Sequence, residues 1–314
     1  MIKHGRILAA GALLAGALVA GALVAGALVT TPAGAAPTGS TASCSLRLGS
    51  VTSGGDHTLQ TITAAPSAGA RTVGPNDLYP DGETGLASSV RYEPVAPAGE
   101  QRQGLVTIVD QLYNSTYLTD GTGTAAVPGT VKSTHIGGGW KGVYFWLDRS
   151  DYSAAGVARS NLYALHSVPG DADIVRWRLT AGGPQYKTVF GGFKAVKTMA
   201  LIGQGRTSDT FLAITNGGAL YTVQVPTGSG KPVVTKVRTS TWQVFGTLIA
   251  ERCGQQGTLL LGIDRVHGTG YLYAVGHANG AATVIKGLGK VPSALSPTEP
   301  YFRYYNAGTV LNGA

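Results

Sequence analysis

The sequence predicts an all-β protein, built as a five-bladed β-propeller of four-stranded antiparallel blades. Residues 242–286 contain four short strand-like runs separated by glycine-rich turns, which is the pattern of one blade. Two sequence markers recur about every 50 residues, which indicates an array of similar units. Only 13% of the residues are charged and 47 are glycine, a composition that favours many turns over solvated helices.

The most complete unit lies between Trp242 and Lys286. Its runs are rich in Leu, Ile, Val and aromatic residues, which favour strands, and glycine-containing turns separate them. The four strands of this unit are predicted at 242–250, 258–263, 271–275 and 283–286.

The first repeating marker is an aromatic residue that opens a strand. Trp140, Phe193 and Trp242 each begin such a segment, and they lie 53 and 49 residues apart. Weaker copies are expected near residue 88 and near residue 293. Five starts at this spacing predict five blades of about 50 residues each.

The second marker is a Leu-Tyr pair. It occurs at 112–113, 162–163, 220–221 and 272–273, with spacings of 50, 58 and 52 residues. Two markers with one period support each other, and each pair is expected on the corresponding strand of its blade.

The residues left over at the two ends predict how the propeller closes. The last start leaves about 20 residues, which is enough for two strands. Residues 44–48 and 57–62 read as two further strands before the first start. We therefore expect the N-terminal strands to join the C-terminal blade and close the ring, because closure removes exposed sheet edges. Residues 64–85 are expected to form a long loop.

The N-terminus has the pattern of a secretory signal peptide. Lys3 and Arg6 precede an uncharged run of Ala, Leu, Val and Gly at 7–29, and the cleavage pattern Ala-Gly-Ala follows at 33–35. We expect residues 1–35 to be a signal peptide, residues 36–314 to be one propeller domain, and the protein to be extracellular. An uncleaved membrane anchor is the alternative, because the apolar run is long.

Cys44 and Cys253 are the two cysteines of the chain. In a secreted protein a pair of cysteines is expected to form a disulfide, and the predicted ring closure places Cys44 beside the blade that begins at 242. The alternative is two independent buried thiols.

The repeats resemble those of the tachylectin-2-type five-bladed propellers. Three segment pairs carry the resemblance: Gly138-Gly139-Trp140 with Leu162-Tyr163-Ala164, Gly191-Gly192-Phe193 with Leu220-Tyr221, and Trp242 with Leu272-Tyr273-Ala274-Val275. The resemblance implies a five-bladed ring that binds N-acetylated sugars, with one site per blade and without catalysis. The sequence departs from that pattern in its unequal blades and in Phe193, which stands where the other two openings have Trp.

Aromatic side chains of the repeats are the candidate ligand-binding residues. An aromatic face offers apolar area for a sugar ring, and Tyr and Trp add a polar group. The alternative is that the same side chains wedge between blades as core. The candidates are Trp140, Tyr163, Trp177, Tyr221, Trp242 and Tyr273.

No motif in the sequence predicts catalysis, a metal site or a cofactor. The histidines are scattered over different units, and neither a metalloprotease nor a hydrolase motif is present. Asp148 and Asp151 provide too few oxygen ligands for a dedicated Ca²⁺ site. The segment 228–231 imitates the end of a phosphate-binding loop, but Pro232 follows where a Ser or Thr is required.

These observations predict a secreted, non-catalytic propeller that binds a carbohydrate or a cell-surface polymer. The alternative is an extracellular hydrolase or lyase with carboxylates at the mouth of the propeller. The formal charge of +8 becomes +6 once Lys3 and Arg6 are removed, and the remaining cations form no run that would predict nucleic-acid binding. Membrane association is not expected after signal cleavage.

Overall fold

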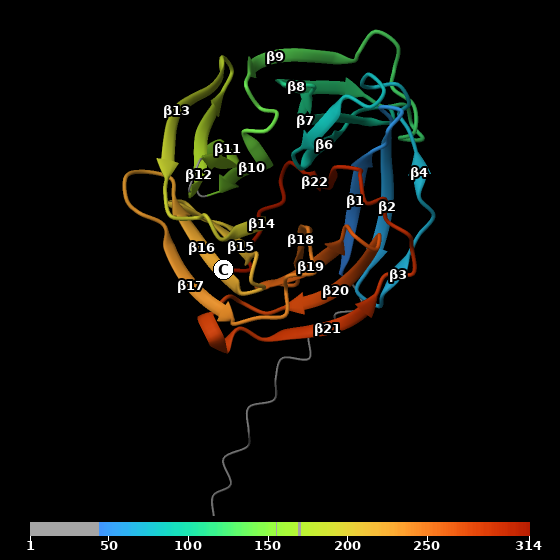
Figure 1. The fold of residues 1–314 in the computed structure, drawn as a ribbon. Coiled ribbons are helices and arrows are strands. Elements are labelled where there is room, and N and C mark those ends of the chain that lie inside the picture. Colours follow the sequence, from blue (N-terminus) through green and yellow to red (C-terminus); the bar gives the residue numbers. More distant parts are fainter. Residues whose placement is uncertain (1–43, 155, 169–170) are drawn as a thin grey trace, which may run out of the picture. The chain divides into compact units, whose positions relative to one another are not determined.

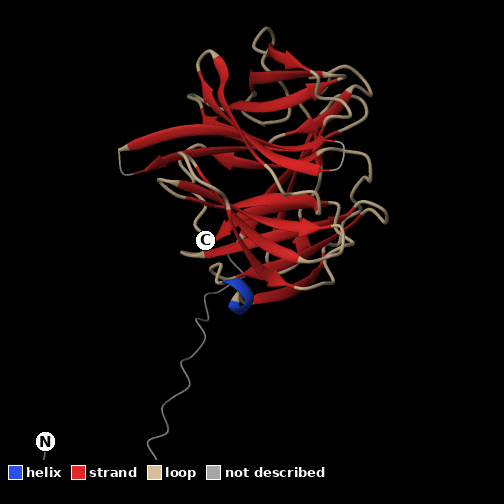
Figure 2. Cartoon of the chain, turned by 60° about the vertical axis from the view of Figure 1, so that its left-hand side comes forward, coloured by secondary structure: helices blue, strands red, loops and turns tan. Residues whose placement is uncertain are grey.

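The computed structural model describes residues 44–154, 156–168 and 171–314. All of them belong to the compact unit Gly39–Ala314, and the predicted signal segment lies outside the described residues. Within the described part, the regular structure is β-strand apart from one short 3-10 helix, η2 (Gly280–Ala282), as Figure 2 shows. None of the described residues forms a helix long and apolar enough to span a membrane.

Three consecutive stretches of chain each form a four-stranded antiparallel sheet, as predicted (Figure 1). Strands that follow one another in sequence are neighbours in each sheet, so hairpins connect them. The first sheet contains β10 (Tyr144–Ala154), β11 (Val157–Val168), β12 (Asp171–Thr180) and β13 (Gly183–Phe190). The second contains β14 (Val196–Gln204), β15 (Ser208–Thr215), β16 (Leu220–Pro226) and β17 (Val233–Arg238). The third contains β18 (Thr247–Cys253), β19 (Gly257–Asp264), β20 (Thr269–Val275) and β21 (Ile285–Lys290).

The two ends of the described chain contribute to a fourth, ten-stranded sheet. Its main path runs β3-β2-β1-β22-β6-β7-β8-β9, while β4 pairs with β2 and β5 pairs with β7. The early strands are β1 (Ser45–Val51), β2 (His57–Thr63), β3 (Ser67–Ala68), β4 (Thr72–Val73) and β5 (Thr84–Ala87). The others are β6 (Val90–Pro94), β7 (Glu100–Ile108), β8 (Gln111–Leu118), β9 (Lys132–Gly138) and β22 (Tyr301–Asn306).

The last strand joins the first strands of the chain, as Figure 1 shows for β22, β1 and β6. β22 pairs antiparallel with β1 and parallel with β6, each time through three residue pairs. The prediction of two strands after residue 293 was wrong, because the described chain there forms only β22. The following residues instead reach β14, where Asn312 bridges Gly203 and the Leu311 carbonyl accepts a hydrogen bond from the Gln204 amide.

The first strands of successive sheets pack against each other, and the apolar core lies between the sheets. β10 contacts β14, β14 contacts β18, and β18 contacts β22. Each apolar cluster draws buried side chains from two neighbouring groups of strands. One cluster, for example, joins Tyr163 and Ile174 of the first sheet to Met199 and Phe211 of the second. The inward face of each sheet is therefore covered by the next sheet.

A recurring backbone hydrogen bond marks the residue that opens each unit. The amides of Tyr79, Trp140, Phe193, Trp242 and Leu295 donate to the carbonyls of Gly55, Asp110, Ala172, Gly218 and Gly268, over 2.9–3.2 Å. Four of the acceptors lie in the connections β1–β2, β7–β8, β15–β16 and β19–β20, and Ala172 is the second residue of β12. Leu295 therefore agrees with the start expected near 293, whereas the start expected near 88 is at Tyr79, which is neither Trp nor Phe.

Strand limits differ from the prediction at the opening turns. Trp242 was placed inside a strand, but β18 begins at Thr247, and the Trp242 carbonyl accepts a hydrogen bond from the Phe245 amide in the preceding turn. The predicted loop at 64–85 contains the two-residue strands β3 and β4 and reaches into β5.

The Leu-Tyr marker was wrong at one of its four positions. Tyr113, Tyr221 and Tyr273 lie on β8, β16 and β20, the third strands of their units, whereas Tyr163 lies on the second strand, β11. The reason is the length of the β10–β11 hairpin, whose strands have 11 and 12 residues and displace the later strands along the sequence. Trp177 on β12 occupies the third-strand position of that sheet.

The predicted disulfide is confirmed. Cys44 and Cys253 are joined by an S–S bond, with their Cα atoms 5.3 Å apart. The bond fastens the residue before β1 to the end of β18, and both cysteines pack against the apolar cluster between these strands.

Replacing His57 with Gln is expected to reduce the loss of folding stability that occurs as the pH becomes acidic. Burial, helped by Arg102, lowers the pKa of His57 to about 3, and its Nδ1 lies 2.7 Å from the Tyr117 hydroxyl. The unfolded chain protonates this histidine below pH 6.5 while the folded chain does not, so stability falls as pH decreases from 6.5 towards 3. The contribution is about 1.4 kcal/mol per pH unit.

Urea unfolding of the wild type and His57→Gln between pH 7 and 4 measures this effect. Because carboxylates also titrate in this range, the difference between the two proteins is the relevant quantity, and it should change by about 3 kcal/mol in favour of the variant. Parallel pH profiles would contradict the assignment.

Candidate functional site

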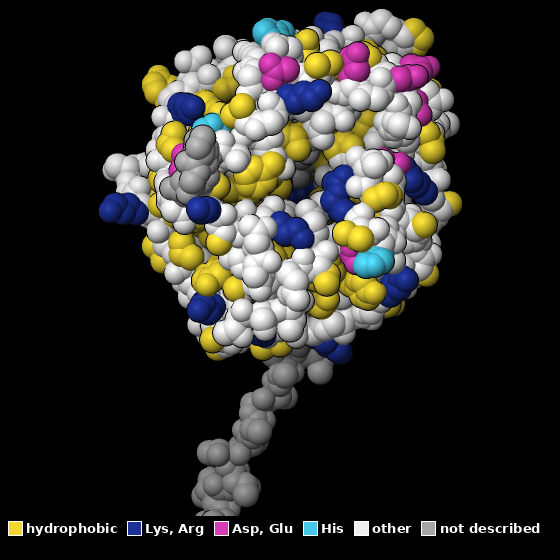
Figure 3. Space-filling model, in the orientation of Figure 1, with side chains coloured by type: hydrophobic (Ala, Val, Ile, Leu, Met, Phe, Trp, Pro, Cys, Tyr) yellow, Lys and Arg dark blue, Asp and Glu magenta, His cyan; other side chains and the backbone are white. Residues whose placement is uncertain are grey.

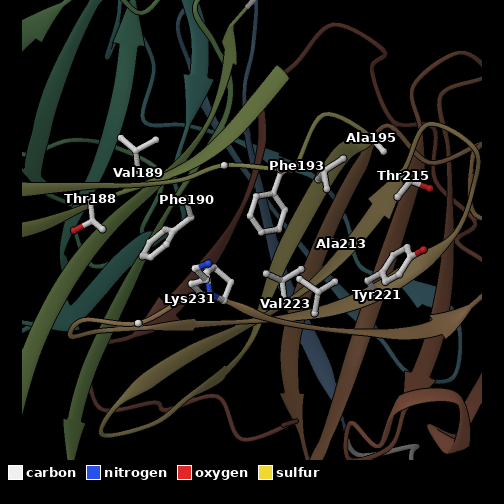
Figure 4. Close-up of a pocket in the computed structure, with 16 residues that line it drawn as sticks. Thr188, Val189, Phe190, Phe193, Ala195, Ala213, Thr215, Tyr221, Val223 and Lys231 are labelled. Atoms are coloured by element: carbon white, nitrogen blue, oxygen red, sulfur yellow. The ribbon is translucent and has the colours of Figure 1, made fainter. Parts of the chain in front are cut away.

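A cavity of about 640 Å³ lies between the β10–β13 sheet and the β14–β17 sheet. Phe190 ends β13, Phe193 opens the next unit, and Tyr221 and Val223 come from β16, so three elements provide its apolar surface (Figure 4). We call it the aromatic cavity, defined by Phe190, Phe193, Val196, Tyr221, Val223 and Lys231.

The cavity exists because the residues that open this unit are smaller than those that open the two neighbouring units. In the preceding sheet Trp140 contacts Tyr144, with ring centroids 4.4 Å apart, and also Trp177 at 5.9 Å. In the following sheet the corresponding space is filled by aromatic rings as well, since Trp242 contacts Tyr273 at 4.8 Å. Between them stands Phe193, followed by Lys-Ala-Val with no second aromatic residue. The space that two or three large rings fill elsewhere is therefore hollow here.

Two polar groups reach the aromatic cavity without a partner from the described residues. Neither the Tyr221 hydroxyl nor the Lys231 ammonium group has a hydrogen bond or ion pair there, while the Lys236 ammonium group lies 5.8 Å from the centre of the Tyr221 ring. An apolar surface with a few unpaired polar groups is typical of sites for small organic ligands, and the volume lies within their usual range.

A buried ion pair connects the same two sheets. Asp209 on β15 is fully buried and accepts hydrogen bonds from both terminal nitrogens of Arg159, each at 2.7 Å. Its carboxylate also accepts from Ser150 at 2.8 Å and from the Tyr163 hydroxyl at 2.7 Å. Burial and then the Asp209 charge raise the pKa of Tyr163 well above its usual value. The network holds the two sheets together, because these donors come from the neighbouring sheet.

The structure separates the six predicted ligand-binding residues into three groups. Tyr221 lines the aromatic cavity. Trp140 and Trp242 are buried, with Trp177 and Tyr273 half-buried against them, in the two filled counterparts of the cavity. Tyr163 is completely buried and bonded to Asp209, so its ring is not exposed to solvent.

Sequence reasoning missed Phe190, Phe193, Val223 and Lys231 as cavity residues. The signal that could have identified them is Phe193, because the other two repeats have Trp at the corresponding position. Where neighbouring repeats place a large side chain and one repeat places a smaller one, the packing between units leaves space. Lys231 was noted only for its resemblance to a phosphate loop.

The described residues contain no group of three or more His, Cys, Asp or Glu placed to hold a metal ion. Asp264 and His267 do interact, with the His267 Nδ1 2.7 Å from an Asp264 oxygen, but the side chain of His267 is 75% exposed on a turn. This pair supports the local turn.

Comparison with known proteins finds similarity only among solved structures. No protein-family model matches the chain, and no curated protein is similar enough to be counted as a relative. The resemblance to tachylectin-2-type propellers therefore stays a prediction.

Three solved lectin structures are similar to the chain over most of its length. A fucose-specific lectin from Aleuria aurantia shares 11% identity, with 83% of this chain and 84% of that chain covered and a TM-score of 0.47. A second structure, an Aleuria aurantia lectin described as a six-bladed β-propeller, has 13% identity, 83% and 84% coverage and a TM-score of 0.45. A lectin from Burkholderia pseudomallei has 12% identity, 82% and 84% coverage and a TM-score of 0.42. At this degree of similarity neither their blade number nor their ligand passes to this chain.

Proposed function

We propose that the protein is a secreted, non-catalytic carbohydrate-binding protein whose main glycan site is the aromatic cavity. The observation that carries the proposal is the hollow beside Phe193, whereas Trp140 and Trp242 each pack against further aromatic rings. Tyr221, which is half-buried, offers ring surface to the apolar face of a sugar, and Phe190 and Phe193, which are 6% and 7% exposed, add apolar area beside it. Tyr221 and Lys231 offer hydrogen-bonding groups to its hydroxyl or acetamido groups.

We propose further that residues 36–314 form a five-bladed propeller closed by the N-terminal strands. Five opening residues donate to five preceding units, and the series includes Tyr79, which donates to Gly55 beyond β1. The pairing of β22 with β1 supports the same closure. The signal-peptide pattern at residues 1–35 and the disulfide support an extracellular location.

The charge of the mature chain agrees with a polymeric or anionic partner at the cell surface. The proposed cleavage leaves a formal charge of +6, that is, +8 less Lys3 and Arg6. Figure 3 shows Lys and Arg side chains spread over the face drawn, with several beside the hollow at its middle. Such a distribution favours encounter with acidic polymers rather than specific recognition.

Replacing Phe193 with Trp is expected to abolish glycan binding while the fold is retained. The indole would restore the residue type found at Trp140 and Trp242 and would occupy the cavity. We expect an affinity loss of roughly 30-fold or more, because the ligand loses a central aromatic contact and its space. Stability should change by less than about 1 kcal/mol, since the new ring fills an existing void.

A glycan array identifies the preferred sugar, and calorimetric titration with that sugar measures the variant. N-acetylglucosamine and its dimer belong in the first panel, since the sequence resemblance implies them. Val266→Trp is the matched control, because it adds the same ring at a site that is 84% exposed. The proposal fails if no glycan binds at high protein concentration, or if Phe193→Trp binds as tightly as the control.

A further inference from the structure

A second, polar cavity of about 590 Å³ lies at the preceding interface, between the strands β6–β9 and the β10–β13 sheet. We infer that this polar cleft binds the anionic group of a small hydrophilic ligand, independently of the aromatic cavity. The ligand class is a carboxylate, sulfate or phosphate, either free or carried by a sugar. The cleft is defined by Arg91, Gln103, Asn114, His135, Arg149 and Ser160, and none of its lining residues is Asp or Glu.

Arg149 provides a buried cation at the inner end of the cleft. Its side chain is 4% exposed, and its side-chain partner is Asp151, 3.0 Å from Nη2. Asp151 also accepts hydrogen bonds from Ser160 at 2.6 Å and from Tyr305 at 2.5 Å. The described residues give the remaining terminal nitrogen of Arg149 no hydrogen-bond partner. A guanidinium group that binds one carboxylate through a single terminal nitrogen still has N–H donors for a second acceptor.

Arg91 and two amides continue the row of donors outwards. Arg91 lies 3.6 Å from Glu93, and both side chains are partly exposed, so this ion pair is loose. The Gln103 amide donates to the Asn114 carbonyl oxygen at 3.1 Å, which leaves the Asn114 NH₂ group with no partner among the described residues. Arg91 and Gln103 are direct neighbours across β6 and β7. The donors therefore come from both walls of the cleft, and the carboxylates that pair with its two arginines, Asp151 and Glu93, are not among the residues that line it.

The next interface places its carboxylate on the other strand of the corresponding pair. Asp151 and Gln204 each lie 11 residues after their opening residues, Trp140 and Phe193, and they pair with Ser160 and Asp209. Ser160 thus stands at the position of Asp209. At the later interface Asp209 supplies the acceptor for the donors of the preceding sheet, whereas here the carboxylate of the strand pair is on Asp151, which binds Arg149 through one terminal nitrogen and accepts from Ser160. The structure assigns the N–H donors of Arg149 that Asp151 does not bind to a bound anion, and Nε is a buried donor without a partner among the described residues.

Titration of the full mature protein with glucuronate, sulfate, phosphate and glucose tests this inference. Calorimetry and amide chemical shifts should show saturable binding of at least one of the three anions and none of glucose. Binding of glucuronate alone assigns a sugar-borne carboxylate, whereas binding of sulfate or phosphate assigns a free or ester-linked oxyanion. No saturable binding of any anion at about 10 mM would overturn the inference, because that affinity is the weakest expected of a built site.

Two variants that leave the buried Arg149–Asp151 ion pair intact test where the anion binds. Gln103→Glu places an internal carboxylate beside Arg91 at nearly constant volume, and Arg91→Gln removes the outer cation. Each should weaken anion binding at least roughly tenfold, a loss typical of one charged contact. Gln255→Glu makes the same charge change at an exposed, remote position and should bind as the wild type does.

Phe193→Trp separates this site from the glycan site. It should leave anion binding at the polar cleft unchanged, even where it abolishes binding in the aromatic cavity. Equal anion affinity in Gln103→Glu, Arg91→Gln and the wild type would place the anion elsewhere and overturn the assignment.

Discussion

Replacing Cys44 and Cys253 with serine is expected to lower the free energy of unfolding by about 5 kcal/mol. The two residues are separated by 209 positions, so the disulfide closes a very long loop in the unfolded chain. In the chain-entropy description, the restriction of the unfolded state increases with the logarithm of the loop length. The bond also fastens the start of β1 to β18, an interface otherwise held by apolar packing.

Denaturant unfolding of the oxidised wild type and of the variants measures the loss. Cys44→Ser, Cys253→Ser and the double variant should be about equally destabilised, because each lacks the same covalent bond. If the double variant lost less than about 1 kcal/mol, the bond would not restrict the unfolded chain as described.

Replacing Asp209 with Ala is expected to cost about 3–5 kcal/mol, because it leaves the Arg159 guanidinium group buried without its counter-charge. Asp209 is fully buried, and Arg159 binds it through both terminal nitrogens. Ser150 and Tyr163 lose the same acceptor. Unpaired buried donors carry their full desolvation cost, so the loss exceeds that of one ordinary hydrogen bond.

Thermal and urea unfolding check this value, and Asp81→Ala is the matched control. Asp81 is exposed and should change stability by less than about 0.5 kcal/mol. Adding Arg159→Met to Asp209→Ala should recover part of the loss, since it removes the stranded charge. Equal stability of Asp209→Ala and the control would show that the ion pair does not hold the sheets together.

The repeat that begins at Trp242 was predictable because local pattern determines it. Its apolar runs at 258–263 and 271–275 coincide with β19 and β20 to within two residues. Tyr163 was placed on the wrong strand because spacing alone does not reveal an elongated hairpin. Its true counterpart, Trp177, follows a charged residue rather than Leu, so no sequence marker identified it.

The candidate sites were less predictable than the fold. Of the six aromatic residues proposed from the sequence, Tyr221 lines the aromatic cavity. An aromatic residue on the third strand faces either a cavity, as Tyr221 does, or another ring, as Tyr273 does. The size of the residue that opens its unit decides which. Phe193 differs from Trp140 by one ring, and that difference acts across an interface between sheets. At the polar cleft the carboxylate of the strand pair is on Asp151 rather than on Ser160, whose counterpart Asp209 is 49 residues away in sequence.

The position of β22 between β1 and β6 has a consequence for biogenesis. Until residues 301–306 have been synthesised, β1 and β6 each present an unpaired edge, and the sheet that contains them is incomplete. A nascent chain therefore cannot complete this sheet before residues 301–306 leave the ribosome. Contacts between the first and last strands also form slowly, because they are distant in sequence. Export through a channel that admits only unfolded chains would benefit from this delay.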